Sequence, residues 1–171
     1  MADNYVLIGF MGAGKTSIGK LLAKKTGKTF LDTDDMIVKQ MNLSINEIFS
    51  LYGEEYFRNL ETNLLKALCD NAHDSIISVG GGLPIKEENR PYLKKLGTVV
   101  YLSVTEATVV KRLKNDTTRP LLSGTREEAK AKVRDLLSKR KDIYEACAHK
   151  VIVTDKLNKE QIVEKILEES K

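Results

Sequence analysis

The feature that most constrains this chain is a glycine-rich segment, residues 9–16, which matches the pattern G-x-x-x-x-G-K-[ST]. It follows the apolar run Tyr5–Ile8, which is typical of a buried strand, and it precedes residues 17–25, where apolar side chains recur at helical spacing. Glycines let backbone N–H groups turn inward around a phosphate, and the positive end of the following helix adds to the attraction. Strand, loop and helix in this order predict a site for a nucleoside triphosphate.

Two side chains of this loop have separate expected tasks. Lys15 can bridge the outer phosphates, and the hydroxyl of Thr16 can bind Mg²⁺. The other contacts to the phosphates are expected from the loop and the first turn of the helix. The residues expected to bind the nucleotide here are Gly12, Ala13, Gly14, Lys15, Thr16 and Ser17.

Short apolar runs alternate with amphipathic stretches along the rest of the chain. The runs lack the polar alternation of a half-exposed strand, which favours a parallel sheet covered by helices on both faces. Strands are expected over residues 5–8, 29–32, 75–79, 98–102 and 151–153. Helices are expected over residues 17–25, behind a capping box at Ser44 and Glu47, after Gly53, and over residues 105–113, 126–146 and 159–169.

A length of 171 residues, without linker or repeat, predicts one three-layer α/β domain over residues 1–171. Its ligand is expected at the carboxyl ends of the strands. Two apolar stripes on the helices near residues 45–70 are expected in the core. They are formed by Ile45, Ile48, Phe49 and Tyr52, and by Phe57, Leu60, Leu64 and Leu68.

Two carboxylates, Asp32 and Asp34, close the second strand. In an extended chain residues i and i+2 point to the same side, so both can face the crevice beside Thr16. One could hold water on Mg²⁺ and the other could bind a substrate hydroxyl, since paired carboxylates repel unless a cation or ligand uses them. A helix N-cap at Asp34 is the alternative.

Two further motifs follow. Gly80, Gly81 and Gly82 close the third strand and are interpreted as a place where the backbone approaches a ligand closely or adopts φ > 0, with a plain flexible turn as the alternative. Arg119, before Pro120, lies in the polar segment 114–124, where a cation on a closing loop could stabilise a transferring phosphoryl group. The alternative for Arg119 is a solvated surface side chain.

Charge and composition exclude several classes. The net charge of +4 comes from 21 Lys and 7 Arg against 24 acidic residues, which permits an anionic ligand but gives no basic and aromatic patch for nucleic acid. No run approaches the ~18–20 apolar residues of a membrane span, and the N-terminus lacks the pattern of a signal peptide. The isolated cysteines and histidines do not predict a disulfide or a zinc site; they are Cys69, Cys147, His73 and His149. A monomeric protein of the cytoplasm is expected.

Taken together, the motifs resemble the shikimate kinase family, in the nucleoside-monophosphate-kinase branch of P-loop proteins, over nearly the whole chain. The phosphate loop alone is shared by many families, and the order of the other motifs is more specific. The motifs are residues 9–16, Phe30 to Asp34, Gly53 to Arg58 with Glu61, Gly80 to Gly82, Arg119 to Leu122, and Arg140 four residues before Tyr144.

The resemblance implies a sheet in the order 2-3-1-4-5 and a lid over residues 114–124. It implies Mg²⁺-dependent transfer of the γ-phosphoryl group of ATP to the 3-hydroxyl of shikimate. The products would be shikimate 3-phosphate and ADP, on the route to chorismate and the aromatic amino acids.

The resemblance also assigns roles to residues. Asp34 would bind ring hydroxyls and would either act as the base or mainly orient the reacting hydroxyl. Arg58 and Arg140 would grip the carboxylate of shikimate, and the three glycines would contact the substrate. Arg112 would pack along adenine and Arg119 would reach the phosphates of ATP. The implied catalytic residues are Lys15, Asp34 and Arg119, and the implied metal ligands are Thr16 and Asp32.

From the residues alone, Arg58 and Arg140 would be read as solvated helix arginines, so these two roles depend on the resemblance. Glu61 would hold Arg58 in place. The chain departs from many relatives in the adenine loop, residues 155–158, where Lys156 is the sole basic candidate.

Three other functions were considered. A kinase such as gluconate kinase would share the phosphate loop and the acidic strand end, but would not need Arg58, the three glycines and Arg140 together. A regulatory nucleotide-binding protein would not need Lys15, Thr16, Asp32, Asp34 and Arg119. A nucleic-acid-binding module would show clustered cations.

Overall fold

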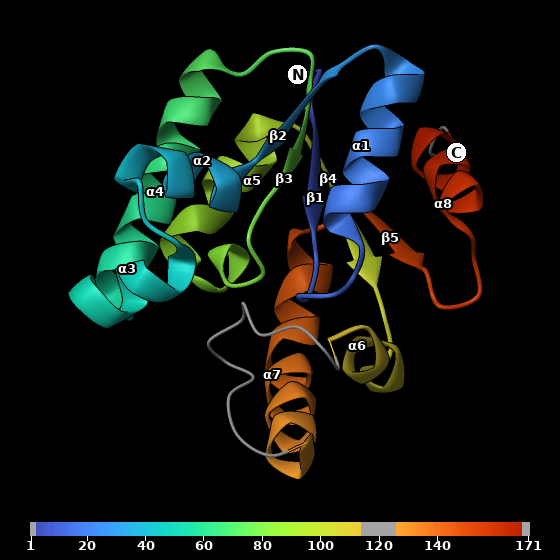
Figure 1. The fold of residues 1–171 in the computed structure, drawn as a ribbon. Coiled ribbons are helices and arrows are strands. Elements are labelled where there is room, and N and C mark those ends of the chain that lie inside the picture. Colours follow the sequence, from blue (N-terminus) through green and yellow to red (C-terminus); the bar gives the residue numbers. More distant parts are fainter. Residues whose placement is uncertain (1–2, 114–125, 169–171) are drawn as a thin grey trace.

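The computed structural model describes residues 3–113 and 126–168, in which a five-stranded parallel sheet has the order β2-β3-β1-β4-β5 (Figure 1). The strands are β1 (Tyr5–Ile8), β2 (Thr29–Asp32), β3 (Ser75–Ser78), β4 (Thr98–Ser103) and β5 (Lys150–Val153). The α/β class and the strand order are confirmed. Each boundary lies within one residue of the prediction, because apolar runs of this kind are buried on both faces.

Eight α-helices and two short 3₁₀ turns surround the sheet in the part of the chain that is described. The helices are α1 (Lys15–Thr26), α2 (Thr33–Met41), α3 (Ile45–Tyr52), α4 (Glu54–Asn71), α5 (Arg90–Leu96), α6 (Glu106–Leu113), α7 (Arg126–Cys147) and α8 (Lys159–Leu167). The capping box at Ser44 is confirmed, and α1 ends at Gly27, which lies in the left-handed region at φ 74°. Two helices, α2 and α5, and the turns Leu83–Ile85 and Glu87–Asn89 were not predicted.

The helices form layers on the two faces of the sheet. In Figure 1, α1 and α8 lie side by side and cover one face, while α5 and α7 contact β4 on the other. The helices α2, α3 and α4 form a group beyond the β2 edge. This arrangement leaves the carboxyl ends of the strands accessible between α1, the α2–α3 group and α7.

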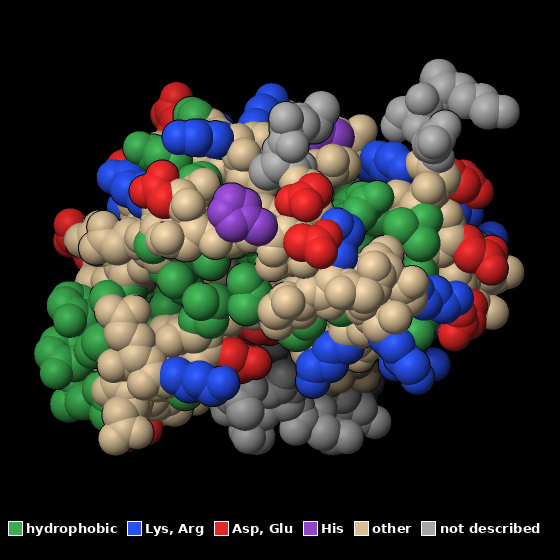
Figure 2. All heavy atoms as spheres, turned by 90° about the horizontal axis from the view of Figure 1, so that it is seen from above, with side chains coloured by type: hydrophobic (Ala, Val, Ile, Leu, Met, Phe, Trp, Pro, Cys, Tyr) green, Lys and Arg blue, Asp and Glu red, His purple; other side chains and the backbone are tan. Residues whose placement is uncertain are grey.

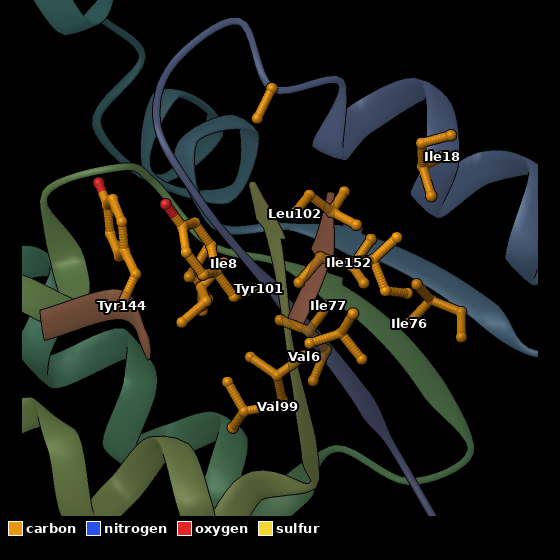
Figure 3. Packing of buried hydrophobic residues seen from close by; sticks show 14 of the residues in the cluster. Val6, Ile8, Ile18, Ile76, Ile77, Val99, Tyr101, Leu102, Tyr144 and Ile152 are labelled. Carbon is orange, nitrogen blue, oxygen red and sulfur yellow. The ribbon is translucent and has the colours of Figure 1, made fainter. Parts of the chain in front are cut away.

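The main core lies between the sheet and its two helix layers. Figure 3 shows strand side chains such as Val6, Ile77 and Val99 interdigitating, all of them fully buried. A second, smaller cluster of Ile37, Ile48 and Phe57 lies inside the α2–α3–α4 group. Close packing of this kind fixes the relative positions of the elements that carry the site.

The two predicted apolar stripes are only partly in this core. Phe57 and Leu68 are buried, and Ile48 is fully buried. The placement of Tyr52 in the core was wrong, because its side chain is 52% exposed and its ring stacks on the ring of Tyr56 with 4.7 Å between centroids. The last turn of α3 projects beyond α4, so the apolar pattern there continues further than the packing does.

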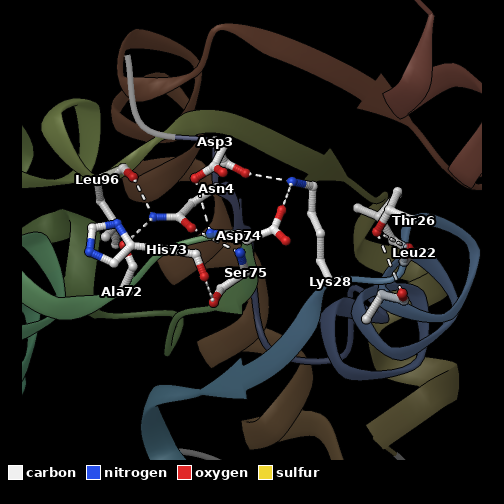
Figure 4. Close-up of polar contacts among 11 residues, drawn as sticks. Asp3, Asn4, Leu22, Thr26, Lys28, Ala72, His73, Asp74, Ser75 and Leu96 are labelled. Atoms are coloured by element: carbon white, nitrogen blue, oxygen red, sulfur yellow. Dashed lines mark hydrogen bonds and ion pairs between the residues drawn. The ribbon is translucent and has the colours of Figure 1, made fainter.

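The amino ends of the strands are fastened by a buried amide (Figure 4). The side chain of Asn4 donates to the carbonyls of Ala72 and Leu96 and accepts from the N–H of Ser75. One side chain thereby joins the start of β1 to the end of α4, the end of α5 and the start of β3. These hydrogen bonds lie at the amino ends of the strands, whereas the phosphate loop lies at the carboxyl end of β1.

Figure 2 views the molecule from this amino-end side. Charged side chains of both signs are mixed over it. Apolar side chains gather on the side where Figure 1 places α3 and α4. Among residues 3–113 and 126–168, no helix combines the length and the apolar composition that a bilayer span requires.

Candidate active site

The loop between β1 and α1 has the backbone conformation of a phosphate cradle. Gly12 and Gly14 have φ of 79° and 90°, in the region that only glycine adopts without strain, and Gly14 is the N-cap of α1. Position 9 must also be glycine, because a Cβ there would lie 2.8 Å from the carbonyl oxygen of Leu102. The Nζ of Lys15 donates to the carbonyls of Gly9 and Phe10 at 2.6 and 3.0 Å, which holds its charge over the loop.

Helix α6 brings Arg112 to this loop. Its Nη1 donates to the carbonyl of Gly12 at 2.9 Å, across one hundred residues of sequence. The start of α6 is held in turn by Asp155, whose Oδ1 accepts from the N–H and hydroxyl of Thr105 and from the hydroxyl of Thr108, at 2.7–3.0 Å. Burial raises the pKa of Asp155, but these hydrogen bonds outweigh burial and the net pKa is lowered. The loop after β5 and the start of α6 are therefore joined at one carboxylate.

The two predicted metal ligands lie together. The hydroxyl of Thr16 donates to Oδ2 of Asp32 at 3.2 Å, which places two hard oxygen atoms side by side at the phosphate loop. Such oxygens suit Mg²⁺, which commonly uses one or two protein oxygens together with substrate phosphates and water. The described residues contain no group of three or more His, Cys, Asp or Glu side chains that could hold a metal by themselves. The pair therefore fits an ion that is completed by a nucleotide.

The expected extended geometry at Asp34 was wrong. Asp32 is the N-cap of α2, and its Oδ1 accepts from the N–H groups of Asp34 and Asp35 at 2.9 and 3.2 Å. Asp34 is thus already in the first turn of a helix, and the cap is two residues earlier than the alternative placed it. The chain turns because the first carboxylate satisfies N–H groups that a helix leaves unpaired. Asp32 therefore both caps α2 and faces Thr16.

A pocket of about 400 Å³ lies beside this pair, between the end of the sheet and the α2–α3–α4 group. Its polar wall contains every residue predicted to bind the second substrate. Its apolar wall comes from α2, α3 and the start of α4. It is lined by Met11, Thr16, Asp32, Asp34, Asp35, Val38, Ser44, Ile45, Asn46, Phe49, Phe57, Arg58, Glu61, Gly80, Gly81, Gly82 and Arg140.

Arg58 is held by two carboxylates on its own helix. Nη1 donates to Oε1 of Glu61 at 2.8 Å and Nη2 donates to Oε2 of Glu54 at 3.2 Å. Burial lowers the pKa of Arg58, but the charges and hydrogen bonds of these carboxylates outweigh it and the net pKa is raised. The guanidinium is therefore fixed and charged at the pocket wall.

Glu61 is fully buried, and its Oε2 is a buried oxygen without a hydrogen-bond partner among the described residues. Burial, with a smaller contribution from the charge of nearby Asp34, raises the pKa of Glu61 to about 7 against the opposing charge of Arg58. A carboxyl that lies between a cation and a second carboxylate is a feature of functional sites.

Arg140 approaches from α7. It is 8% exposed, and its guanidinium lies 5.8 Å from the centroid of the Phe10 ring, a cation–π distance. The two arginines therefore line one pocket from different helices, α4 and α7, as a planar carboxylate would require.

The three glycines pass between these groups. None of them lies in the left-handed region, so the positive φ that was one of the two expected reasons for glycine is not found here. The reason for glycine is space: a Cβ on Gly80 would lie 2.8 Å from Oδ1 of Asp34 and 2.9 Å from Oε2 of Glu61, and one on Gly82 would overlap the guanidinium of Arg58. The backbone thereby leaves room for the polar groups around the pocket.

Comparison with known proteins decides the family. The family model described as "Shikimate kinase" matches residues 11–171. The shikimate kinase of Thermodesulfovibrio yellowstonii is 43% identical over 97% of this chain and 94% of its own length, and that of Enterococcus faecalis is 40% identical over 99% of both. The solved structure of the shikimate kinase of Acinetobacter baumannii in complex with shikimate is 38% identical, with a TM-score of 0.90 over 96% of this chain and 90% of that one.

The chain belongs to the shikimate kinase family. It is thus an ATP-dependent kinase, a transferase with a P-loop, of a family that serves the biosynthesis of aromatic amino acids. This membership decides against a family such as gluconate kinase and against a nucleotide-binding protein outside the kinases.

The structure brings together most of the site residues expected of a shikimate kinase. Asp34, Arg58, Arg140 and the glycines line one pocket with Thr16 and Asp32, and Arg112 contacts the phosphate loop. Arg119 and the lid, residues 114–124, lie outside the described residues.

Two groups of residues were missed. The apolar wall formed by residues such as Val38 and Phe49 was not recognised, because the stripe on α3 was interpreted as core alone. Thr33 and Tyr144, which bond to the glycines, were also missed: their partners are backbone atoms without side chains, which a residue pattern does not reveal.

Proposed function

We propose that this chain transfers the γ-phosphoryl group of ATP to the 3-hydroxyl of shikimate, giving shikimate 3-phosphate and ADP. The observation that carries the proposal is the single pocket that contains Asp34, Arg58 and Arg140 directly beside Thr16 and Asp32. An acceptor with a carboxylate at one end and hydroxyls at the other matches this distribution of charge. The related enzyme from Acinetobacter baumannii was solved with shikimate bound.

The arginines would hold the carboxylate. A guanidinium offers paired N–H donors that match a carboxylate, which the single ammonium of lysine cannot do. Arg58 is already braced by Glu54 and Glu61, so little side-chain freedom remains to be lost on binding. With the carboxylate fixed at one end, the ring hydroxyls are directed toward Asp34.

Asp34 would act on the hydroxyl that attacks. The carboxylate accepts the proton of the 3-hydroxyl as its oxygen bonds to phosphorus, and ADP leaves with the bond to the bridging oxygen broken. Asp34 is fixed in the first turn of α2 and half-buried. Lys15, held over the phosphate loop, would contact the outer phosphates of ATP and balance their charge.

Mg²⁺ would be held by Thr16, with Asp32 beside it, and when bound it would neutralise charge on the phosphates. Arg119 as a further cation on these phosphates stays a prediction, as do the lid, the monomeric state and the cytoplasmic location. Lys156 is exposed, and no role of the adenine loop toward the base follows from its position.

An assay with three acceptors tests the proposal. ADP release is measured with ATP, Mg²⁺ and shikimate, quinate or gluconate, and the site of phosphorylation is read by ³¹P and ¹H NMR. Shikimate should be used far better than the other two, with phosphate on O3. Lys15→Ala, checked for folding by circular dichroism, is the control for contaminating kinases. Absence of shikimate turnover by the wild type would overturn the proposal.

A further inference from the structure

The three glycines of the pocket wall have no side chains with which to fix their own position. A Cβ on Gly81 would lie 3.5 Å from the carbonyl oxygen of Gly9 and from the N–H of Met11, and 3.7 Å from Nη1 of Arg140. The segment therefore lies between the phosphate loop and the arginines, where a small shift would change the spacing between both substrates. Glycine is also the residue with the greatest backbone freedom.

Two buried hydroxyls hold this segment at successive residues. The N–H of Gly80 donates to Oγ1 of Thr33 at 3.1 Å, and the hydroxyl of Tyr144 donates to the carbonyl of Gly81 at 2.6 Å. The side chains of Thr33 and Tyr144 are both fully buried. The neighbouring carbonyls of Gly80 and Gly82 accept from the following 3₁₀ turn, at 3.1 and 3.2 Å, which does not tie the segment to α2 or α7.

Each hydroxyl comes from an element that also carries a proposed shikimate-binding residue. Thr33 directly precedes Asp34 on α2, and Tyr144 is one turn after Arg140 on α7, so it lies on the same face of that helix. The hydrogen bonds thus run from α2 through Gly80 and Gly81 to α7. In the proposed complex, Asp34 on α2 would bind the hydroxyl end of shikimate and Arg140 on α7 its carboxylate end, one on each side of these hydrogen bonds.

Tyr144 is itself rigidly placed. Its ring packs on that of Tyr101 with 5.1 Å between centroids, and Figure 3 shows the two hydroxyls at the same end of the pair. Burial raises the pKa of Tyr144 to about 12, partly opposed by Arg140, so its hydroxyl stays a donor at neutral pH.

We propose that Thr33 and Tyr144 are positioning residues for the kinase reaction, whose hydroxyls hold the glycine segment so that Asp34 and Arg140 keep the spacing that shikimate requires. Neither hydroxyl is assigned contact with a substrate. The inference rests on the proposed function, because it concerns the same pocket.

Isosteric variants test it. Tyr144→Phe and Thr33→Val remove one hydroxyl each with little change in volume, and Thr33→Ser retains the acceptor. Tyr101→Phe is the matched control, because it removes the hydroxyl of the neighbouring ring. Steady-state rates are measured with shikimate and ATP varied in turn, and binding of shikimate and of ADP is measured by calorimetry.

Loss of one hydrogen bond predicts about a tenfold lower kcat/KM for shikimate in Tyr144→Phe and Thr33→Val. The KM for ATP and the affinity for ADP should change less than twofold, which a general loss of folding would not give. Thr33→Ser and Tyr101→Phe should stay within about twofold of the wild type.

The inference is overturned if Tyr144→Phe and Thr33→Val keep wild-type kcat/KM for shikimate, or if ATP parameters worsen equally. If Tyr144→Phe does not fold, the Thr33→Val and Thr33→Ser pair still decides. A wild type that does not phosphorylate shikimate would contradict the proposed function itself, whereas an active wild type with unaffected variants contradicts the positioning role alone.

Discussion

Glu61 and Arg58 show how single residues at this site depend on their surroundings. On an exposed helix, an ion pair between two such residues one turn apart would stabilise the helix by only a few tenths of a kcal/mol. Here Glu61 is fully buried and Arg58 is largely so, and the unpartnered Oε2 of Glu61 faces the region of Asp34 and Gly80. Burial therefore opposes ionisation of Glu61 while Arg58 favours it, and the effect of burial is the larger, so the pKa of Glu61 is raised to about 7.

Glu61→Gln should remove a pH dependence of stability. The folded-state pKa of Glu61 is about 7, whereas the ordinary pKa of a glutamate side chain is 4.5. Between these values the folded state keeps a proton that the unfolded state releases, so this contribution is complete below about pH 4.5 and is lost as pH rises through 7. The loss is on the order of 3 kcal/mol. Urea unfolding of both proteins at pH 5 and 8 should show the wild type losing stability relative to the variant.

Glu54→Gln is the matched control for this prediction, because Glu54 is the exposed carboxylate partner of the same arginine. Its difference from the wild type should be the same at both values of pH, as expected of a solvated group. A difference between wild type and Glu61→Gln that is also constant from pH 5 to 8 would show that Glu61 does not hold the extra proton.

At this scale the sequence predicted charged residues better than hydroxyls. Asp34 belongs to a pair of carboxylates that the residues themselves indicate, whereas Arg58 and Arg140 were assigned through the family resemblance, and all three line the pocket. Thr33 and Tyr144 act on backbone atoms of a segment distant in sequence, and a pattern of residue types does not show which carbonyl a hydroxyl will meet.

Among the elements, local sequence patterns predicted the strands and the helix with a capping box, but they did not predict α2. Residues 29–32 form a strand, and a helix begins at the next residue because the carboxylate of Asp32 caps it. Sequence patterns showed the carboxylates but not the turn, since strand and helix share no breaker residue between them. Helix α5 was also not predicted; it has a proline at its first positions.

Helix α6 depends on a residue from a different element. Asp155→Ala removes the acceptor for Thr105 and Thr108, and we expect the start of α6, and with it Arg112, to shift from the phosphate loop. The KM for ATP should rise several-fold, because a cap contributes about 1 kcal/mol and more is lost when three donors lose their acceptor. The KM for shikimate should remain near that of the wild type, measured with ATP saturating.

Lys159→Ala, an exposed change in the first turn of α8, is the control for alterations near the adenine loop. It should leave both KM values unchanged. An equal rise of both KM values in Asp155→Ala would mean that the carboxylate supports the fold in general and not the nucleotide side.

At the scale of the whole molecule, two buried apolar clusters of unequal size stabilise the fold. The larger joins the sheet to its helix layers, and the smaller consists of Ile37, Ile48 and Phe57 under the pocket wall. Leu64 packs against both. The wall of α2 and α3 therefore has a small core of its own, within what we propose to be one domain. The chain composition predicted one core and did not separate these parts.

Hydrogen exchange should distinguish the two clusters. Amides of α2 and α3 should exchange faster than those of β1 and β4, because less apolar surface is buried when that part opens. Shikimate should slow exchange in α2 and α3 more than ADP does, since they form the acceptor wall. Uniform exchange across both clusters in the free protein, measured by mass spectrometry of peptic fragments, would contradict this division.

The central position of β1 has a consequence for synthesis of the chain. Tyr5 on β1 is paired with Ile76 on β3 and with Thr98 on β4, so β1 gains one neighbour shortly before the midpoint of the sequence and the other only after it. During translation the phosphate loop has no sheet to support it, and closure of long loops slows such pairing. The nucleotide site, which is encoded first, is therefore expected to form late, and a ribosome that stalls before β4 would release a chain unable to bind ATP.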